Sequence, residues 1–386
     1  MELRKELAFS VEEFQARLET VRERLRERNV AGMLVHTPEN LFYLSGYQTP
    51  GYYAYQALLV PEDRLKTPIM LLRRLEESNV KALSWIDTMR AYADTEDPIE
   101  MTASVVQENG LGNMPLGIEK GSWFLTIRDF ERLQRLLPEA KFVDCTGVVE
   151  QGRLVKSAAE IAYIRKAARA AEAAMQAGLE ATAAGKTENE VAAEIYRASI
   201  LAGCEYTSLP QFIASGYRSS LAHATWGGRR IEAGDVVYYE VCGTVQRYSA
   251  ALYRSATLGP PKDLFRRMSD ATLAGLNRVL ETMKPGVTCG EVAEAWASEI
   301  VKGGFPRPFK RAGYSIGISF PPDWGEGHIL SLKYDETEIL RPGMVFHVPS
   351  SIREIGVALV GNSETILVTE RGCEALTSFP RQHFVK

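Results

Sequence analysis

Cysteine is scarce in this sequence, and the few cysteines follow no pattern. The 386 residues include five of them, an odd number without CxxC spacing, which argues against a disulfide framework and against a structural zinc site. We therefore expect buried free thiols. The cysteines are Cys145, Cys204, Cys242, Cys289 and Cys373.

Long apolar runs and an excess of positive charge are also missing. No segment approaches the roughly 18 apolar residues that span a bilayer, and the opening stretch MELRKELAFSVEEF lacks the continuous apolar core of a signal peptide. We expect a cytoplasmic protein that does not bind membranes. The 45 basic and 49 acidic residues leave a net charge of -4, which argues against a nucleic-acid binder and favours a small or neutral ligand.

The sequence does contain enough apolar residues for a large core. With 45% hydrophobic residues over 386 positions, the chain should form two or three domains. Residues 10–28 have apolar side chains at helical spacing and a capping box, which predict an amphipathic helix. The alternating helical and strand-like segments that follow are typical of an α/β layer domain. We expect this first domain to cover residues 1–156.

The second part, residues 157–386, contains an internal repeat. It opens with a capping box from Ser157 to Glu160 and a long Ala-rich helix. Residues 187–192 and 288–293 lie 101 positions apart, and both read T-x-x-E-V-A. After a loop, each is followed by a strand-rich segment, GDVVYYEV or PGMVFHVP. The repeat predicts an α+β domain of two related halves that form a curved antiparallel sheet with helices on one face.

One acid stands out in a predicted β-hairpin over residues 234–259. Glu240 lies in the apolar run VVYYEV, which favours extended structure. Such a carboxylate is either on the exposed face of an edge strand or buried with partners, because burying an unpaired charge costs several kcal/mol. The hairpin alone leaves both possibilities open.

Several stretches resemble the creatinase/aminopeptidase P/methionine aminopeptidase superfamily (M24), whose catalytic domain has the pita-bread fold. They are LVKSAAEIAYIRKAA, AHATWGGRRIEAGDVVYYE, AGYSIGI, LRPGMVF and ETILVTERG. The resemblance covers the whole chain and implies a pita-bread domain over residues 157–386, preceded by a creatinase/prolidase-type domain over residues 1–156.

The resemblance also implies where the metal ligands of the metallopeptidases would fall. Their two Asp, one His and two Glu positions correspond here to Glu240, Ala251, Tyr314, Pro349 and Ser363. Four of these five have lost the ligand, and divalent cations need several oxygen or nitrogen donors. We therefore expect no metal and no other cofactor. The last two positions are matched by eye, and Glu354 and Glu364 lie near them.

A metal-free member can still be an enzyme, as creatinase shows for the superfamily. The histidine that precedes the hairpin is retained as His223, in SSLAHATWGG. A single histidine is more often a packing or capping residue, but its position before the GD turn favours catalysis. The resemblance implies Glu240 as nucleophile or general base, His223 as proton shuttle and Tyr314 as a hydrogen-bonding group.

Three further stretches, GYSIGISFPPDWGE, FYLSGYQTPGYYAYQALLV and VVYYEVCGTVQRY, resemble bacterial ectoine hydrolases. Those enzymes open the cyclic amidine of ectoine to an N-acetylated diaminobutyrate. The resemblance implies a homodimer in which the first domain of one subunit closes the site of the other. The expected substrate-binding residues are Asp323, Trp324, Glu326, Tyr52, Tyr53, Tyr55, Gln56, Arg247 and Arg254. Each of the two arginines could equally be a solvated strand residue.

Two departures from the ectoine hydrolase pattern leave other substrates open. Ser249-Ala250-Ala251 replaces an expected His-Cys-Pro run, and a glutamate is missing around Gly361. One alternative is a creatinase-like amidinohydrolase that acts on another guanidino or amidino acid. A second is a non-catalytic relative that binds a small molecule. A third, an Xaa-Pro dipeptidase, predicts activation by manganese or cobalt.

Overall fold

The computed structural model describes residues 4–386 and divides into two compact units, Met1–Arg153 and Leu154–Lys386. The border falls close to the predicted one after Lys156. None of the helices in residues 4–386 is both long and apolar enough to cross a membrane.

The amino-terminal unit contains a six-stranded sheet in the order β4-β3-β2-β1-β5-β6. Its strands are β1 (Gly32–Val35), β2 (Ala57–Pro61), β3 (Ile69–Arg73), β4 (Met89–Tyr92), β5 (Pro115–Ile118) and β6 (Lys141–Asp144). Its helices are α1 (Val11–Glu27), η1 (Pro50–Tyr53), η2 (Arg74–Glu76), α2 (Pro38–Ser45), α3 (Glu77–Leu83), α4 (Pro98–Glu108), α5 (Ile127–Leu136) and α6 (Glu150–Arg153). The predicted first helix is confirmed, with Ser10 as its N-cap.

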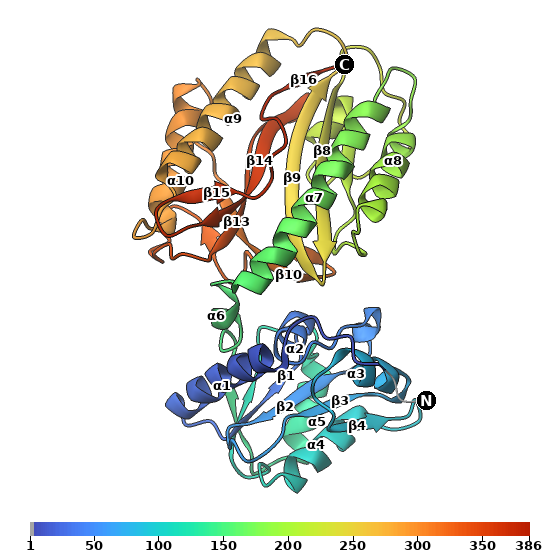
Figure 1. The fold of residues 1–386 in the computed structure, drawn as a ribbon, viewed down its shortest axis with the longest axis vertical. Helices are drawn as coiled ribbons and strands as arrows, with labels where there is room; N and C mark the ends of the chain where they lie inside the picture. The colour runs from blue at the N-terminus through green and yellow to red at the C-terminus, as the bar shows by residue number, and fades with distance from the viewer. Residues whose placement is uncertain (1–3) are drawn as a thin grey trace. The chain divides into compact units, whose positions relative to one another are not determined.

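The carboxy-terminal unit begins with the long helix that the sequence predicts. Its helices are α7 (Ala158–Ala181), α8 (Glu188–Leu201), η3 (Gly216–Ser220), α9 (Asp263–Thr282) and α10 (Cys289–Lys302). Capping boxes form at Ser157, Thr187 and Thr288. The helices α7 and α8 precede the first hairpin, and α9 and α10 precede the second. The internal repeat is therefore confirmed as two helix-helix-hairpin halves (Figure 1).

The sheet of this unit has ten strands, seven of which follow the order β15-β14-β13-β10-β9-β8-β7. The strands are β7 (Phe212–Ser215), β8 (Val236–Val245), β9 (Tyr248–Thr257), β10 (Gly313–Phe320), β11 (Asp323–Gly325), β12 (Ser331–Leu332), β13 (Val345–Glu354), β14 (Ala358–Val368), β15 (Cys373–Ala375) and β16 (Phe384–Val385). The seven-strand path is antiparallel throughout, whereas β16 pairs with β9 in parallel.

The helices pack on one face of this sheet because alternate strand residues are apolar. Val237, Tyr239 and Val241 of β8 share a core cluster with residues of α7 and α8. In the other half, Phe346 and Val348 of β13 pack with residues of α9 and α10. Since successive strand residues point to opposite faces, the intervening residues of β8 and β13 lie on the face away from the helices.

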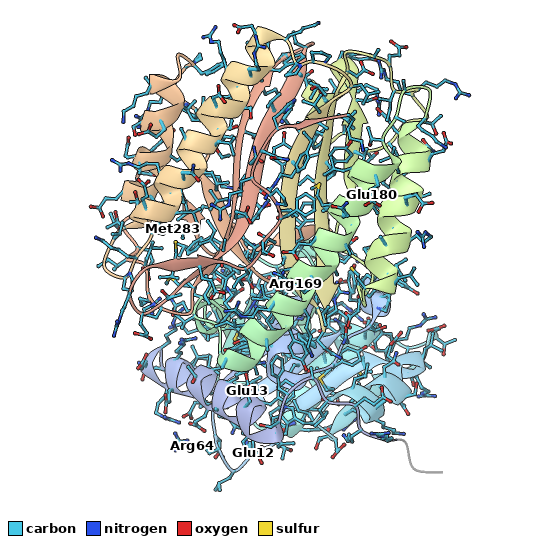
Figure 2. The ribbon with its side chains drawn as sticks, turned by 45° about the horizontal axis from the view of Figure 1, so that its top comes forward. Glu12, Glu13, Arg64, Arg169, Glu180 and Met283 are labelled. Atoms are coloured by element: carbon cyan, nitrogen blue, oxygen red, sulfur yellow. The ribbon has the colours of Figure 1, made fainter. Side chains whose placement is uncertain are left out.

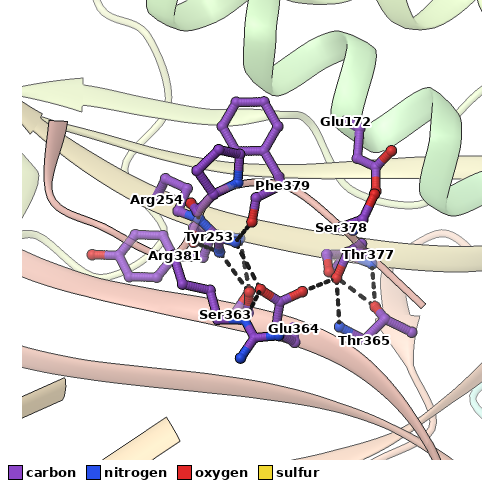
Figure 3. A network of polar contacts seen from close by, with 12 residues as sticks. Glu172, Tyr253, Arg254, Ser363, Glu364, Thr365, Thr377, Ser378, Phe379 and Arg381 are labelled. Atoms are coloured by element: carbon purple, nitrogen blue, oxygen red, sulfur yellow. Dashed lines mark hydrogen bonds and ion pairs between the residues drawn. The ribbon is translucent and has the colours of Figure 1, made fainter. Parts of the chain in front are cut away.

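A buried polar network joins the two halves on the helix side of the sheet. Arg254 of β9 and Glu364 of β14 are both fully buried and form an ion pair of 2.7 Å (Figure 3). The segment after β14 is also held against α7, where Arg169, which is labelled in Figure 2, donates to Ser378 Oγ over 2.9 Å. The ion pair between Arg254 and Glu364 holds β9 and β14 side by side. The residues of these two strands that point to the opposite face of the sheet are therefore close together as well.

Candidate active site

Glu240 lies in a row of residues that crosses four strands. It pairs with Tyr253 across β8 and β9, and the backbone N–H of Tyr253 donates to Ser363 Oγ over 2.7 Å. Ser363 in turn pairs with Pro349 across β14 and β13. Three of the five residues at the expected metal-ligand positions therefore occupy one row on the face without helices.

A neighbouring row contains the other two positions. Ala251 of β9 pairs with Cys242 of β8, and its backbone N–H donates to Thr365 Oγ1 over 3.1 Å. Thr365 pairs with His347 of β13, which pairs with Tyr314 of β10. The structure thus brings together all five residues that the resemblance selected.

The donors at these positions do not fit the two cations of a metallopeptidase. Ala251 and Pro349 carry no side-chain donor, and burial raises the pKa of Tyr314 well above its usual value, so its hydroxyl stays protonated. Only Glu240 offers a carboxylate. No cluster of three His, Cys, Asp or Glu residues in the described part of the chain could hold a metal ion, and hard cations require several such ligands.

His347 is a buried residue of the site that the sequence interpretation missed. Its Nδ1 lies 2.9 Å from the Tyr314 hydroxyl, and its Nε2 lies 2.8 Å from Ser363 Oγ. Burial, together with the charges of Lys310 and Arg311, lowers its pKa to about 3, so the imidazole is neutral. Its position two residues before Pro349, on the same strand face, was a signal that could have identified it.

Tyr314 connects His347 to Trp324. The indole Nε1–H of Trp324 donates to the Tyr314 hydroxyl over 3.0 Å, and because an indole only donates, the tyrosine oxygen is the acceptor. The hydroxyl proton can then be donated to Nδ1 of His347. A chain of hydrogen bonds therefore fixes Trp324, Tyr314, His347 and Ser363 along the site, and Trp324 is 2% exposed.

Glu240 itself is partly buried and has no hydrogen-bond or ion-pair partner among residues 4–386. Burial raises its pKa from 4.5 to about 7, with a further increase from Asp323, while Lys310 and Arg353 oppose the shift. A carboxylate that titrates near neutral pH and is not engaged by the protein can act as a nucleophile or general base.

His223 follows η3 and is exposed, with a left-handed backbone (φ 55°). Its ring packs against Phe212, with 5.6 Å between centroids. Phe212 is the strand partner of Glu240 and also contacts Trp324 edge-on, at 5.3 Å. His223 and Trp324 thus flank the strand neighbour of Glu240, although no hydrogen bond in the described residues joins His223 to Glu240.

The two acids of the predicted substrate loop have different surroundings. Asp323 is exposed, and its carboxylate accepts from the backbone N–H of Gly325 over 3.0 Å. Glu326 is 1% exposed and forms an ion pair of 2.8 Å with the equally buried Lys156. The structure corrects the expectation for Glu326, because its carboxylate already neutralises a buried lysine, and leaves Asp323 as the accessible acid.

Arg254 is not available to a substrate. All five N–H donors of its guanidinium have protein acceptors, which include Glu364, Phe379 and Ser363 (Figure 3). An arginine has no other donors. The structure therefore replaces the predicted substrate contact with a structural role, that of joining β9 to the segment after β14.

Arg247 is likewise a structural residue. It lies in the tight turn between β8 and β9 and is fully buried. Its guanidinium donates to the carbonyl oxygens of Ser319 and Tyr206 and lies 3.9 Å from the centre of the Tyr206 ring. The structure corrects the prediction that Arg247 binds substrate, because its buried guanidinium is held by these two carbonyl oxygens and by an ion pair of 3.6 Å with Glu205.

Four expected substrate residues lie in the amino-terminal unit. Tyr53 is 79% exposed, whereas Gln56 is buried. The Tyr55 hydroxyl accepts from Thr102 over 3.0 Å within this unit, and the Tyr52 ring contacts Phe124 edge-on. That these residues close the site of a second subunit stays a prediction.

The fold and sequence match known proteins over nearly the whole chain. Residues 162–370 match the model of metallopeptidase family M24, and residues 17–155 match the creatinase/prolidase N-terminal domain. Ectoine hydrolase from Halomonas elongata is 31% identical over 98% of this chain and 99% of its own. Xaa-Pro dipeptidase from Pyrococcus horikoshii is 28% identical over 93% of this chain and 96% of its own.

The crystal structure of the prolidase from Pyrococcus horikoshii superposes with a TM-score of 0.83, at 24% identity, over 95% of this chain and 99% of that one. This similarity confirms the expected α+β fold with its creatinase/prolidase-type first domain. Together the matches make the chain a hydrolase of metallopeptidase family M24.

Proposed function

We propose that the chain is a metal-independent hydrolase that opens a C–N bond of a small cyclic amidine amino acid, with ectoine as the first candidate substrate. The observation that carries the proposal is Glu240, a carboxylate without a protein partner among the described residues and with a pKa of about 7. It is the single carboxylate among the five family ligand positions, so the site favours carboxylate chemistry over metal-activated water.

The groups around Glu240 support a cationic substrate. Asp323 adds a second, accessible acid close enough to raise the pKa of Glu240. Phe212 and Trp324 supply aromatic surface beside it, and aromatic faces attract cations. An amidinium ring would thus meet two carboxylates and an aromatic wall. The relative from Halomonas elongata that is named an ectoine hydrolase supports the same substrate class.

The proposed reaction adds one water across the amidine. Glu240 either attacks the amidine carbon directly or removes a proton from the water that attacks it. The ring C–N bond then breaks, and His223 gives a proton to the leaving nitrogen. In the direct route, water releases Glu240 in a second step. In both routes the proton released by the water returns to His223, which restores the histidine and leaves Glu240 as a carboxylate. Either route therefore converts ectoine and water to an N-acetylated diaminobutyrate.

Product analysis with the purified chain tests this proposal. Incubation with ectoine should yield an N-acetyl-diaminobutyrate by mass spectrometry and NMR, and creatine should stay intact. Release of urea from creatine instead would favour a creatinase-like amidinohydrolase. Binding of ectoine without turnover would favour the non-catalytic relative, and hydrolysis of an Xaa-Pro dipeptide after addition of manganese would favour the dipeptidase named among the relatives.

We further propose that the chain works as a homodimer, with Tyr52 and Tyr53 of one subunit near the site of the other. A monomer by light scattering at full activity would contradict this. If Tyr53→Ala, a change of a 79% exposed side chain, lowers activity without lowering the melting temperature, the residue contributes to a site rather than to its own domain.

A further inference from the structure

We propose that Lys310, Arg353 and the hydroxyl of Tyr253 form a subsite for the carboxylate of the substrate, next to Glu240. This inference rests on the proposed function, because it adds a second recognition group to the same site. It replaces the carboxylate-binding role that the sequence suggested for Arg247 and Arg254, whose guanidinium groups are fully buried and bound by the protein.

Arg353 lies on the same strand face as the site. Pro349, Ser351 and Arg353 alternate along β13, so their side chains share one face. Pro349 pairs with Ser363 in the row of Glu240, and Arg353 lies four residue pairs further along, opposite Leu359. Arg353 is exposed and has no hydrogen-bond or ion-pair partner among residues 4–386. Its planar guanidinium is therefore free to bind a carboxylate through two parallel hydrogen bonds.

Lys310 lies between Arg353 and the row of Glu240. Its Nζ donates to the carbonyl oxygen of Pro349 over 3.2 Å and to Ser351 Oγ over 2.6 Å. An ammonium has three donors, so one remains for a ligand. Burial lowers the pKa of Lys310 to about 8; the charge of Glu240 opposes this shift, and the charge of Arg353 adds to it. Two neighbouring cations repel each other, and an anion bound between them would relieve that repulsion.

Tyr253 supplies the third donor. It is 2% exposed, and its hydroxyl is buried without a hydrogen-bond partner in the described residues. Tyr253 is the strand partner of Glu240, and Arg353 is close enough to both to favour their charged forms. An unpaired buried hydroxyl costs free energy, which a ligand oxygen at this position would recover.

The subsite makes the site bipolar. Lys310 and Arg353 supply positive charge near Glu240, and Asp323 adds an acid whose charge acts on Glu240 with the opposite sign. A ligand with a cationic amidine or guanidine at one end and a carboxylate at the other satisfies both. The substrate class is therefore a zwitterion of this kind.

The experiment compares ectoine with 2-methyl-1,4,5,6-tetrahydropyrimidine, the same ring without the carboxylate. The variants are Arg353→Gln, Arg353→Lys and Lys310→Met, with Arg371→Gln as the matched control. Arg371 is also exposed, and it follows the opposite end of β14. Melting temperatures verify that each variant is folded.

The expected result is selective. Arg353→Gln should lower kcat/KM for ectoine about 10- to 100-fold, mostly through KM, because a hydrogen bond to a charged group is lost. It should leave kcat/KM for the carboxylate-free ring unchanged. Arg353→Lys should recover part of the loss, since it keeps the charge but not the bidentate geometry. Arg371→Gln should behave like wild type.

Equal losses with both compounds would overturn the subsite while leaving the proposed function intact. If wild type turns over neither ectoine nor creatine, the proposed function fails. In that case calorimetry tests the subsite. It compares the affinities for ectoine and creatine with those for the same two compounds without the carboxylate. A preference for the carboxylates that Arg353→Gln abolishes supports it. No preference, or no binding of any of the four, overturns it.

Discussion

Tyr314 and His347 face each other on paired strands, and the Tyr314 hydroxyl lies 2.9 Å from Nδ1 of the histidine. The resemblance places a metal-binding histidine at the position of Tyr314. In this chain a neutral, buried histidine instead comes from the adjacent strand and is satisfied at both nitrogens. Two of the expected ligand positions, Tyr314 and Ser363, thus belong with His347 and Trp324 to a hydrogen-bonded wall beside Glu240.

The first prediction concerns this wall. Tyr314→Phe removes the acceptor of the Trp324 indole and the partner of His347 Nδ1. We expect a loss of about 1–3 kcal/mol in the free energy of unfolding, because two buried groups lose their partner, and a lower kcat. Urea denaturation and steady-state kinetics measure both. Tyr334→Phe is the control, since its hydroxyl donates to the carbonyl oxygen of Pro308 outside the site; an equal effect on kcat would contradict the assignment.

The second prediction concerns pH. Because Glu240 must be ionised to act and burial raises its pKa to about 7, kcat/KM should rise with pH through this value. The raised pKa of Glu240 has the opposite effect on stability, which should fall as pH rises. The folded state binds a proton more tightly than the unfolded state between pH 4.5 and 7, so this group's contribution to stability falls as pH rises through that window.

The stability part of this prediction is measured with Glu240→Gln. At pH 8 the variant should exceed wild type in its free energy of unfolding, by on the order of 1 kcal/mol, because it no longer holds a partly buried charge. At pH 4 the two should be nearly equal. A variant that is less stable at pH 8 would mean that the Glu240 carboxylate is stabilised by its surroundings.

The third prediction separates structural from substrate-binding arginines. Arg254→Met leaves Glu364 buried without its 2.7 Å partner and should cost about 3–5 kcal/mol in the free energy of unfolding. Arg165→Met, which breaks an ion pair of exposed residues with Glu374, should cost less than about 1 kcal/mol. Where Arg254→Met remains folded, KM should be unchanged; a large rise in KM without destabilisation would return Arg254 to the substrate site.

Much of the fold could be predicted because its signals are local. The capping boxes at Thr187 and Thr288 and the strand-rich segments after them identified two related halves, and the structure confirms them. These patterns depend on residues within a few positions of each other. For the same reason, Glu240 could be located on its hairpin.

The rest of the site depends on contacts between distant strands. β9 and β14 meet through side chains, such as Thr365 Oγ1, which bonds both the N–H and the carbonyl oxygen of Ala251. No local pattern reveals which residues such a meeting brings together, so His347 was missed. Most acceptors of Arg254, among them the carbonyl oxygen of Pro380, lie more than a hundred positions away, so the sequence did not reveal that its donors are occupied.

The fourth prediction concerns metal ions. Dialysis against a chelator should leave activity unchanged, and manganese or cobalt should not raise it, because Ala251 and Pro349 supply no ligand. Metal analysis of the active protein accompanies the kinetics. Activity that disappears with the chelator and returns with manganese would contradict the metal-independent mechanism and favour the dipeptidase alternative.

The most direct test of the central claim is the turnover of ectoine by Glu240→Gln. This change removes the reacting carboxylate but keeps its size. We predict that kcat falls by at least about 100-fold while calorimetry still detects ectoine binding. The control Glu370→Gln, a change of an exposed acid in the turn after β14, should retain wild-type turnover. Ectoine hydrolysis by Glu240→Gln at the wild-type rate would contradict the central claim.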